Sequence, residues 1–359
     1  MLSIHRLVQI VLRESMDEET QRAWAERTVR AVNAAFPDAD DGTSKKHQDY
    51  LPHVQECATL IKVYQLNFPG AARLLSQAGV VLQAHGFYPQ SQTLHQLALT
   101  IRKQVFGSEH PEASESLNAL AVLARIQGEY EQAEALHRQA LAIRTKALGP
   151  EHPATGESLN NLGVLYRIQG KYEQAQPLLQ QAISISEQSL GSDHPNTLTI
   201  FVNLAKLYLE QHRFEQAEPL LKQALATSER VLEPGHPIIA HNLSLLARLF
   251  YEQGNHEWAE TLWKQALAII EKAFGPEHPA TVGLLNDLAG LYFVQGNSTQ
   301  AQSFCQRAVS ICEKSLGAEH PDTIAYRQHL ARIVSKQEAK QDGEHPASPA
   351  SRAGQSSSF

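Results

Sequence analysis

The chain has 359 residues, of which 19% are charged and 7% are aromatic, and its formal net charge is −7. This balance argues against a nucleic-acid-binding protein, because affinity for phosphates comes mainly from clustered Lys and Arg. No run approaches the roughly 18 consecutive apolar residues that a transmembrane helix needs, so we expect no membrane partner.

The first 70 residues are predicted to form a separate helical segment. Apolar spacing indicates a short helix over 7–12, a longer one over 17–35 and a third over 52–64, with a turn-rich loop over 37–46. The N-terminus lacks the apolar core and the small-residue cleavage site of a signal peptide. Cys57, Cys305 and Cys312 are too few and too irregularly spaced for a disulfide framework, which favours a reducing, cytoplasmic location.

A 42-residue internal repeat dominates the rest of the chain. The dipeptide His-Pro recurs with every gap equal to 42 residues, at His110, His152, His194, His236, His278 and His320. Three columns of small residues keep this phase: Ala98, Ala140, Ala182, Ala224, Ala266 and Ala308; Ser91, Ala133, Ala175, Ala217, Ala259 and Ala301; Gly79, Ala121, Gly163, Ala205, Ala247 and Ala289. Chance does not hold three columns in phase over six units, so the chain is an array.

Each repeat is predicted to be a pair of helices. In the third repeat, Leu159, Leu162 and Tyr166 are spaced as one face of a first helix, and Gly170 ends it. A second apolar run extends to Leu190, after which Gly191 ends that helix. Small side chains at the columns allow the two helix axes to approach to about 8–10 Å. The sequence therefore predicts an all-α fold.

The repeat resembles the tetratricopeptide family, in its 42-residue, kinesin-light-chain-like form. The resemblance rests on the linker Leu-Gly-Pro-Glu-His-Pro and on the positions Leu162, Gly163, Tyr166, Ala175, Leu179 and Ala182. It implies a right-handed superhelical solenoid of about six helix-turn-helix repeats over residues 71–337. Two departures are Ser91 in an alanine column and His212 in place of the glycine between helices.

The C-terminal flank is predicted to close the array and then lose order. Residues 322–337 have the phase of a seventh first helix without a partner, and they are polar enough for a capping helix. Residues 338–359 are rich in Pro, Ser, Gly and Ala without apolar periodicity, so we expect a disordered tail.

The N-terminal segment resembles the end of the winged helix and the linker of bacterial NB-ARC/STAND-type signalling ATPases. The resemblance rests on the opening Ser3–Gln9 (SIHRLVQ), on Arg13, and on the helix with Trp24 and Ala31–Phe36. In those proteins a nucleotide-binding switch domain precedes a tetratricopeptide array, which implies that such a domain is encoded upstream. This chain has no phosphate-binding Gly-x-x-x-x-Gly-Lys-Ser/Thr string, so we expect no nucleotide hydrolysis by it alone.

No pattern of residues indicates catalysis, a metal or a cofactor. The repeated histidines are separated by one whole repeat each, whereas zinc ligands must converge on one ion at about 2 Å. We interpret His and Pro as shaping the turn into the next helix. Cys305 and Cys312 lie two helical turns apart, which favours packing over metal binding. No Gly-x-Ser-x-Gly elbow is present, so we predict that the chain is not an enzyme.

The first helix of every repeat is expected to line an inner groove, because this is how tetratricopeptide arrays present them. Three columns then face the groove: Ser76, Asn118, Asn160, Val202, Ser244 and Asn286; Val80, Val122, Val164, Lys206, Arg248 and Gly290; Gln83, Arg125, Arg167, Leu209, Tyr251 and Phe293. From these we select as peptide-binding residues Asn118, Arg125, Asn160, Arg167, Lys206, Arg248, Tyr251 and Asn286.

These residue types suit a polypeptide ligand. Amides can hold an extended backbone, cations can meet carboxylates, and Tyr251 with Phe293 can anchor an apolar side chain. The sequence thus predicts a protein-interaction scaffold whose partner is a protein or peptide, acidic or extended. Two alternatives stay open: the cations only keep the inner surface soluble while Phe293 packs between repeats, or the chain is the sensor arm of a signalling ATPase.

Overall fold

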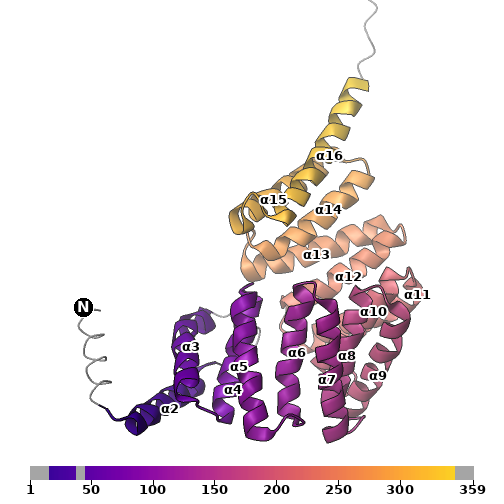
Figure 1. Cartoon of the computed structure of the whole chain (residues 1–359). Helices are drawn as coiled ribbons and strands as arrows, with labels where there is room; N and C mark the ends of the chain where they lie inside the picture. Colours follow the sequence, from indigo (N-terminus) through magenta and orange to yellow (C-terminus); the bar gives the residue numbers. More distant parts are fainter. Residues whose placement is uncertain (1–15, 38–44, 344–359) are drawn as a thin grey trace, which may run out of the picture. The chain divides into compact units, whose positions relative to one another are not determined.

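The structure is a computed structural model that describes residues 16–37 and 45–343. Within these ranges the chain forms α-helices, one short 3-10 helix and no strand, so the predicted all-α class is confirmed (Figure 1). The short helix predicted over 7–12 lies outside the described residues, as does most of the predicted tail. Residues 338–343, expected to be disordered, instead belong to the last helix, α16 (Pro321–Gly343).

In the described part of the chain, two helices precede the repeats. The first, α2 (Glu18–Ala35), begins at Asp17, whose side chain accepts a hydrogen bond from the Thr20 amide, close to the predicted start. The next, α3 (Lys45–Tyr64), begins earlier than predicted and contains Pro52. Proline is expected at a helix start because it lacks an amide hydrogen. Here the turn before Pro52 carries Tyr50 and Leu51, which pack on the core, and this packing favours the longer helix.

Six helical hairpins and a closing helix follow. The hairpins are α4 (Pro69–Ala84) with α5 (Tyr88–Phe106), α6 (Pro111–Ile126) with α7 (Tyr130–Leu148), α8 (Pro153–Ile168) with α9 (Tyr172–Leu190), α10 (Pro195–Glu210) with α11 (Phe214–Val231), α12 (Pro237–Glu252) with α13 (His256–Phe274), and α14 (Val282–Val294) with α15 (Ser298–Leu316). The 3-10 helix η1 (Pro279–Thr281) leads into α14, and α16 stands after the last hairpin without a partner helix among the described residues. The predicted repeat architecture is confirmed.

The small-residue columns lie where the helices of one hairpin touch. Every alanine of the three columns is buried with essentially no exposed surface, and Ser91 is buried in the same way. Gly163 shows why the side chain must be small: a Cβ atom there would stand 2.8 Å from Cγ of Leu179. The predicted reason for the columns, close approach of paired helices, is confirmed.

The repeated histidines cap the first helices. Nδ1 of each His accepts a hydrogen bond from the backbone amide two residues later, at 3.1–3.2 Å, and proline occupies the first turn. This satisfies one of the amide groups that a helix start leaves without a partner. The interpretation that His and Pro shape the turn into the next helix is confirmed.

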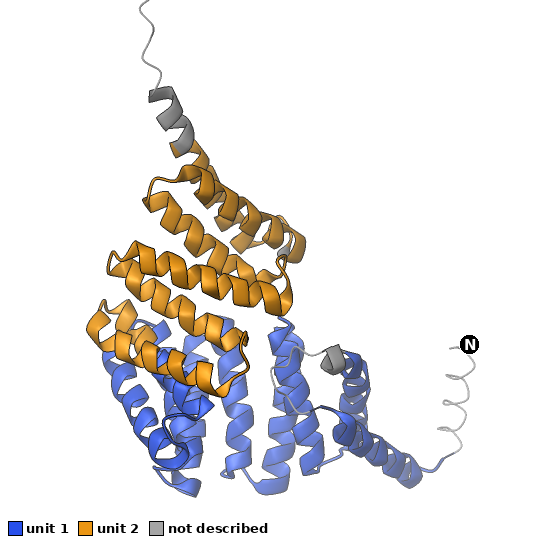
Figure 2. Ribbon diagram, turned by 180° about the vertical axis from the view of Figure 1, so that it is seen from behind, with its two compact units in different colours: residues 1–203 blue, residues 204–359 orange. Residues whose placement is uncertain are grey.

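The chain divides into two compact units, which we call unit 1 (Met1–Asn203) and unit 2 (Leu204–Phe359), with the boundary inside α10 (Figure 2). The core at the start of unit 1 joins the N-terminal helices to the first repeat, since Val29 of α2, Ile61 of α3 and Leu75 of α4 are buried in one cluster. The N-terminal segment therefore closes the apolar face of the first repeat.

Two buried arginines connect successive repeats of unit 1. Arg102 of α5 donates to Ser116 Oγ at 2.6 Å and to the Glu115 carboxylate at 2.7 Å, both on α6. Arg144 of α7, one repeat later, donates to Ser158 Oγ at 3.2 Å and to the Glu157 carboxylate at 3.0 Å, both on α8. Both guanidinium groups are buried and each pairs with a carboxylate, although Nε of Arg102 makes no hydrogen bond among the described residues.

Candidate functional site

The eight predicted groove residues come from the first helices of five repeats. Four lie in unit 1, on α6 and α8, and four in unit 2, on α10, α12 and α14. We use the name first-helix face for the surface that carries the three predicted columns. Each unit has its own part of this face, and the two parts are described in turn.

In unit 1 the predicted asparagines bind other parts of the array. Asn118 is buried, and its amide accepts from His137 Nδ1 at 3.0 Å and donates to Ser158 Oγ at 3.2 Å. Asn160 is also buried, and its Oδ1 accepts from Asn203 Nδ2 at 2.9 Å. Both amides thus connect neighbouring repeats, and a peptide backbone would have to compete with these bonds.

The predicted arginines of unit 1 are half-buried on the same face. Burial lowers the pKa of Arg125, and the nearby Arg167 guanidinium lowers it further. No hydrogen bond or ion pair engages the Arg125 side chain within the described part of the chain. Two like charges that repel each other across adjacent repeats form a site where an added carboxylate would be stabilised.

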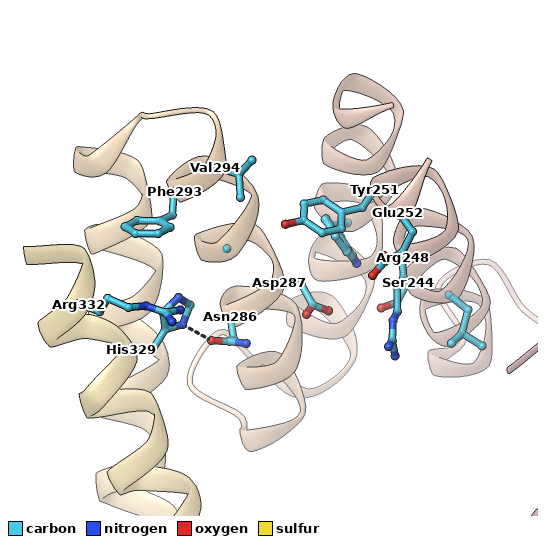
Figure 3. Close-up of a pocket in the computed structure, with 13 residues that line it drawn as sticks. Ser244, Arg248, Tyr251, Glu252, Asn286, Asp287, Phe293, Val294, His329 and Arg332 are labelled. Carbon is cyan, nitrogen blue, oxygen red and sulfur yellow. Dashed lines mark hydrogen bonds between the residues drawn. The ribbon is translucent and has the colours of Figure 1, made fainter. Parts of the chain in front are cut away.

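Unit 2 contains a cavity of about 660 Å³ on its part of the first-helix face, shown in Figure 3. The lining comes from four helices: Ser244, Leu245, Arg248, Tyr251 and Glu252 of α12; Trp263 of α13; Asn286, Asp287, Gly290, Phe293 and Val294 of α14; His329 and Arg332 of α16. We call this cavity the Gly290 pocket. It brings together three of the eight predicted residues, Arg248, Tyr251 and Asn286, and leaves out Lys206.

The pocket is hollow because Gly290 carries no side chain. Every other member of its column has one: Val80, Val122, Val164, Lys206 and Arg248. A Cβ atom at Gly290 would meet no heavy atom within 4 Å. Gly290 therefore differs from Gly163, whose absent side chain makes room for a neighbouring helix. Here the missing side chain leaves open space on a first helix.

Two charged groups of the pocket, Asp287 and Arg248, have no direct partner among the residues that the structure describes. Burial raises the pKa of Asp287 to about 6, and the nearby Arg248 guanidinium opposes that rise. Among the described residues, neither side chain makes a hydrogen bond or an ion pair. In Figure 3 the Asp287 carboxylate points into the space between α14 and α12. A half-buried carboxylate without a direct partner is poorly solvated, so of the charged groups in the pocket it would gain most from pairing with a ligand.

Aromatic rings form the apolar part of the pocket. The rings of Tyr251 and Trp263 lie 5.6 Å apart, and Nε1 of the buried Trp263 has no hydrogen-bond partner among the described residues. Phe293 faces α16, whose Lys336 ammonium lies 4.2 Å from the ring centroid and whose Arg332 lies 5.8 Å from it. Phe293 thus packs against the cations of the closing helix, while Tyr251 and Trp263 border the cavity.

Asn286 and Lys206 are already hydrogen-bonded to histidine side chains of neighbouring helices. Nδ1 of His329 donates to Oδ1 of Asn286 at 2.8 Å, and burial together with Arg332 lowers the pKa of His329 (Figure 3). The Lys206 ammonium donates to Nε2 of His241 at 3.1 Å. Asn286 and Lys206 therefore start from an existing bond that a ligand would have to exchange.

Sequence analysis missed Asp287, Trp263 and the α16 residues. Asp287 has a visible signal, because its column otherwise holds the uncharged residues Gln77, Ala119, Asn161, Asn203 and Leu245. Arg332 of α16 lies 42 residues after Gly290 and so continues its column, a signal that could have found it, whereas nothing in the sequence marks Trp263 on a second helix as a pocket residue.

The described residues include neither a membrane-spanning helix nor a cluster of metal-binding side chains. No helix within residues 16–37 and 45–343 is both long and apolar enough to cross a membrane. In the same residues, no group of three His, Cys, Asp or Glu side chains stands close enough to hold a metal ion.

Comparison with known proteins identifies the repeats. The tetratricopeptide repeat model matches residues 70–146, 117–188, 157–230, 196–259, 238–293 and 281–342. The chain belongs to the tetratricopeptide repeat family. A solved structure from Podosopora anserina, described as a kinesin light chain with nearly identical tetratricopeptide-like repeats, is 30% identical over 58% of this chain and 98% of its own, with a TM-score of 0.50.

More distant structures share the fold of this tetratricopeptide chain. A tetratricopeptide repeat protein from Parabacteroides merdae is 18% identical, over 86% of this chain and 99% of its own, with a TM-score of 0.54. BtubC from P. vanneervenii is 18% identical, over 70% of this chain and 92% of its own, with a TM-score of 0.51. No curated protein matches the sequence.

Proposed function

We propose that this tetratricopeptide protein is an interaction scaffold that binds a protein or peptide partner on its first-helix face and has no catalytic activity. The observation that carries the proposal is the Gly290 pocket, in which Arg248, Tyr251 and Asn286, selected from column positions alone, border one cavity. Its volume lies within the roughly 300–1,000 Å³ typical of ligand sites.

Unit 1 supports the proposal in a different way. Arg125 and Arg167 occupy equivalent positions on α6 and α8, and their mutual repulsion favours an anionic ligand. Because helices present no free backbone groups along their sides, recognition must come from side chains such as these. A partner with an extended, acidic segment would meet both guanidinium groups.

A capture experiment tests the scaffold. The full-length chain is immobilised and incubated with cytosol of the source organism, and retained proteins are compared between the wild type and R125E/R167E. The control is K103E/K272E, which reverses two exposed lysines on second helices, away from the first-helix face. Circular dichroism and thermal melting establish that both variants are folded.

We expect R125E/R167E to lose at least one protein that the wild type and K103E/K272E retain. Equal retention by all three chains would contradict a role for the unit 1 part of the face. Retention that disappears equally in both variants would indicate binding by net charge alone, and it would also contradict the proposal.

A second proposal is that the array is the sensor arm of a STAND-type signalling ATPase, with a nucleotide-binding switch domain encoded upstream. It rests on the sequence resemblance of the N-terminal segment, and its opening residues, 3–13, lie outside the described residues. Sequencing the coding region upstream tests it: a phosphate-loop domain in the same reading frame, or in an adjacent gene, is expected, and its absence would contradict the proposal.

A further inference from the structure

We propose that the Gly290 pocket is a site for an ammonium group, and that a lysine side chain of the partner inserts over Gly290 to pair with Asp287. This inference rests on the proposed function, since it names the chemistry by which unit 2 contacts the partner. It differs from the acidic partner expected from the sequence, because the pocket and the Arg125–Arg167 pair present opposite charges to a ligand.

Asp287 is a half-buried carboxylate that no charged group pairs with directly among the described residues. Burial disfavours the ionised carboxylate, and within the described residues no donor or cation contacts it directly. A buried charge without a partner costs free energy that a ligand of opposite charge can recover. Lysine supplies this charge as three donors on a flexible stem, so it can follow the cavity to the carboxylate.

The shape and the lining of the cavity also fit a lysine side chain. Gly290 leaves open space beside Asp287, which a stem of methylene groups would fill. Tyr251 and Trp263 present aromatic surface on the opposite wall, formed by α12 and α13. Aromatic faces attract cations, so they favour an ammonium over a neutral side chain.

The cations of the pocket do not convert it into an anion site. Arg248 and Arg332 are both exposed, so water screens their charge, and Arg332 already lies against Phe293. Glu252, also exposed, adds a second negative charge to the lining. The lining is balanced in formal charge, and the least solvated of its charged groups is Asp287.

Fluorine NMR of the full chain provides a local test. The protein has three tryptophans, and Trp263 lines the pocket, so 5-fluorotryptophan gives three resonances of which one reports on the site. The W263F variant assigns it. The probes are capped seven-residue peptides of alanine and glycine with a central lysine, acetyl-lysine or glutamate.

We expect the lysine peptide to shift the Trp263 resonance in a saturable way and the acetyl-lysine peptide to leave it unchanged. D287N should weaken lysine-peptide binding at least tenfold, because it keeps the shape and removes the charge. E252Q, which neutralises the exposed carboxylate, should change it less than threefold. D287N removes a poorly solvated charge, so it should fold at least as well as the wild type.

A steric pair of variants tests the position of the site. G290V restores the side chain that the first three repeats carry in this column, so it should abolish the lysine-peptide shift. G283V makes the same change on the same helix at a position outside the pocket lining, where a Cβ atom also meets nothing within 4 Å. It should bind as the wild type does. Both changes raise helix propensity by a similar amount.

The pH dependence provides a third readout. Lysine stays protonated between pH 7.5 and 5, whereas Asp287, with its raised pKa of about 6, loses charge. Binding should therefore weaken as the pH falls through 6, and D287N should show little of this dependence. The other titratable or charged groups that face this site are Arg248 and Glu252 of α12, and Tyr326, His329 and Arg332 of α16. A dependence that persists in D287N would assign the effect to these groups and overturn the role of Asp287.

The remaining outcomes separate this inference from the proposed function. If the glutamate peptide binds in place of the lysine peptide and R248Q abolishes it, the pocket is a carboxylate site: the inference fails and the scaffold stands. If no peptide shifts the Trp263 resonance while R125E/R167E still loses its captured partner, the inference alone fails. If capture is also unaffected, both fail.

Discussion

Unit 1 and unit 2 place polar groups at equivalent repeat positions and use them differently. In unit 1 the column that faces the next repeat holds Arg102 and Arg144, whose guanidinium groups are buried and bonded across the repeat boundary. In unit 2 the same column holds Ser228, Ile270 and Cys312. Unit 1 thus joins its early repeats through buried guanidinium groups in this column, whereas unit 2 has only uncharged side chains there and places its cross-repeat ion pairs, such as Arg307–Glu271 at 2.6 Å, at more exposed positions.

A second buried column, which packs between the two helices of each hairpin, also differs between the two units. The column that begins with His95 and His137 in unit 1 continues with Leu221, Trp263 and Cys305 in unit 2, and all except Leu221 and Leu179 carry a polar or polarisable atom. The buried polar groups of unit 1 serve the array. In unit 2, Asn242 does the same by donating to Ser228 Oγ and to the Ala224 carbonyl, whereas Trp263 and the half-buried Asp287 border a cavity, where the candidate ligand site lies.

The largest effect that we expect is a loss of folding stability of unit 1 at low pH, which tests the contrast between the two units. Burial lowers the pKa of His95 and of His137 to about 4, from an ordinary value near 6.5. The folded state therefore favours neutral histidine, so stability is complete above pH 6.5 and is lost as the pH falls toward 4. The shift corresponds to a loss on the order of 3 kcal/mol for each histidine.

Hydrogen exchange measured by mass spectrometry at pH 7 and 4.5, corrected for intrinsic rates, compares the two units. We expect protection to fall most in α5 and α7, which carry these histidines. In the described part of unit 2, one histidine, His241, has a pKa lowered to about 4 by burial and by Lys206, while acid protonates Asp287 favourably, so the change should be smaller than in unit 1 and centred on α12. H95L is the matched variant, because it reproduces the Leu179–Gly163 contact against Gly79. It should spare α5, and equal loss in H95L and the wild type would contradict the assignment.

A smaller effect is expected from removing one arginine bond of unit 1. R144M keeps the apolar stem but removes the donor to Ser114 Oγ and to the Ala154 carbonyl, while Ser158 Oγ keeps the Asn118 amide as its donor. Buried groups that lose a partner cost about 1–3 kcal/mol each when they stay dry, and the loss here should total about 3 kcal/mol.

Urea denaturation followed by circular dichroism, together with exchange rates in α7 and α8, measures this loss. The control is K146M on the same helix, where the exposed Lys146–Glu109 pair at 3.2 Å should contribute less than 1 kcal/mol. If R144M were as stable as K146M, the buried arginines would be replaceable by apolar side chains, and the contrast between the units would lose its energetic meaning.

The repeat itself could be predicted because the same physical requirement recurs six times. Close helix contact selects Ala or Gly in each hairpin, and each first helix needs a cap, so Ala140 and His152 are copies of one solution. Pro52 led to a helix start that was predicted too late. The packing of Tyr50 and Leu51 on the core extends α3 to the residues before this proline.

The candidate site could be predicted only in part. Column positions place Asn118 and Asn286 on the same face, but they do not reveal that Asn118 bonds His137 on another helix. Gly290 is visible as an exception in its column, yet whether a missing side chain is filled by a neighbour, as at Gly163, or left open depends on three-dimensional packing. One wall of the pocket comes from α16, which the repeat phase predicts as a seventh first helix, but which of its side chains border a cavity depends on three-dimensional packing.

The smallest effect concerns the turn between the helices of a hairpin, where the repeats otherwise agree. Gly128, Gly170 and Gly254 take this turn with φ of 81°, 72° and 79°, whereas His212 takes it with φ of 56°. A side chain in this left-handed region costs roughly 1–2 kcal/mol, and the greater freedom of glycine in the unfolded chain returns part of that gain. H212G should therefore stabilise the α10–α11 hairpin by about 0.5–1 kcal/mol.

The H212A variant separates backbone strain from the side-chain contact. The His212 ring lies edge-on to Phe214, with centroids 5.8 Å apart, and both variants remove this contact while only glycine relieves the strained φ. Thermal melting should therefore rank H212G above the wild type and H212A below it. If both variants melted below the wild type by the same amount, the ring contact would outweigh the strain. The turn of this repeat would then be stabilised by a side chain where the others rely on glycine.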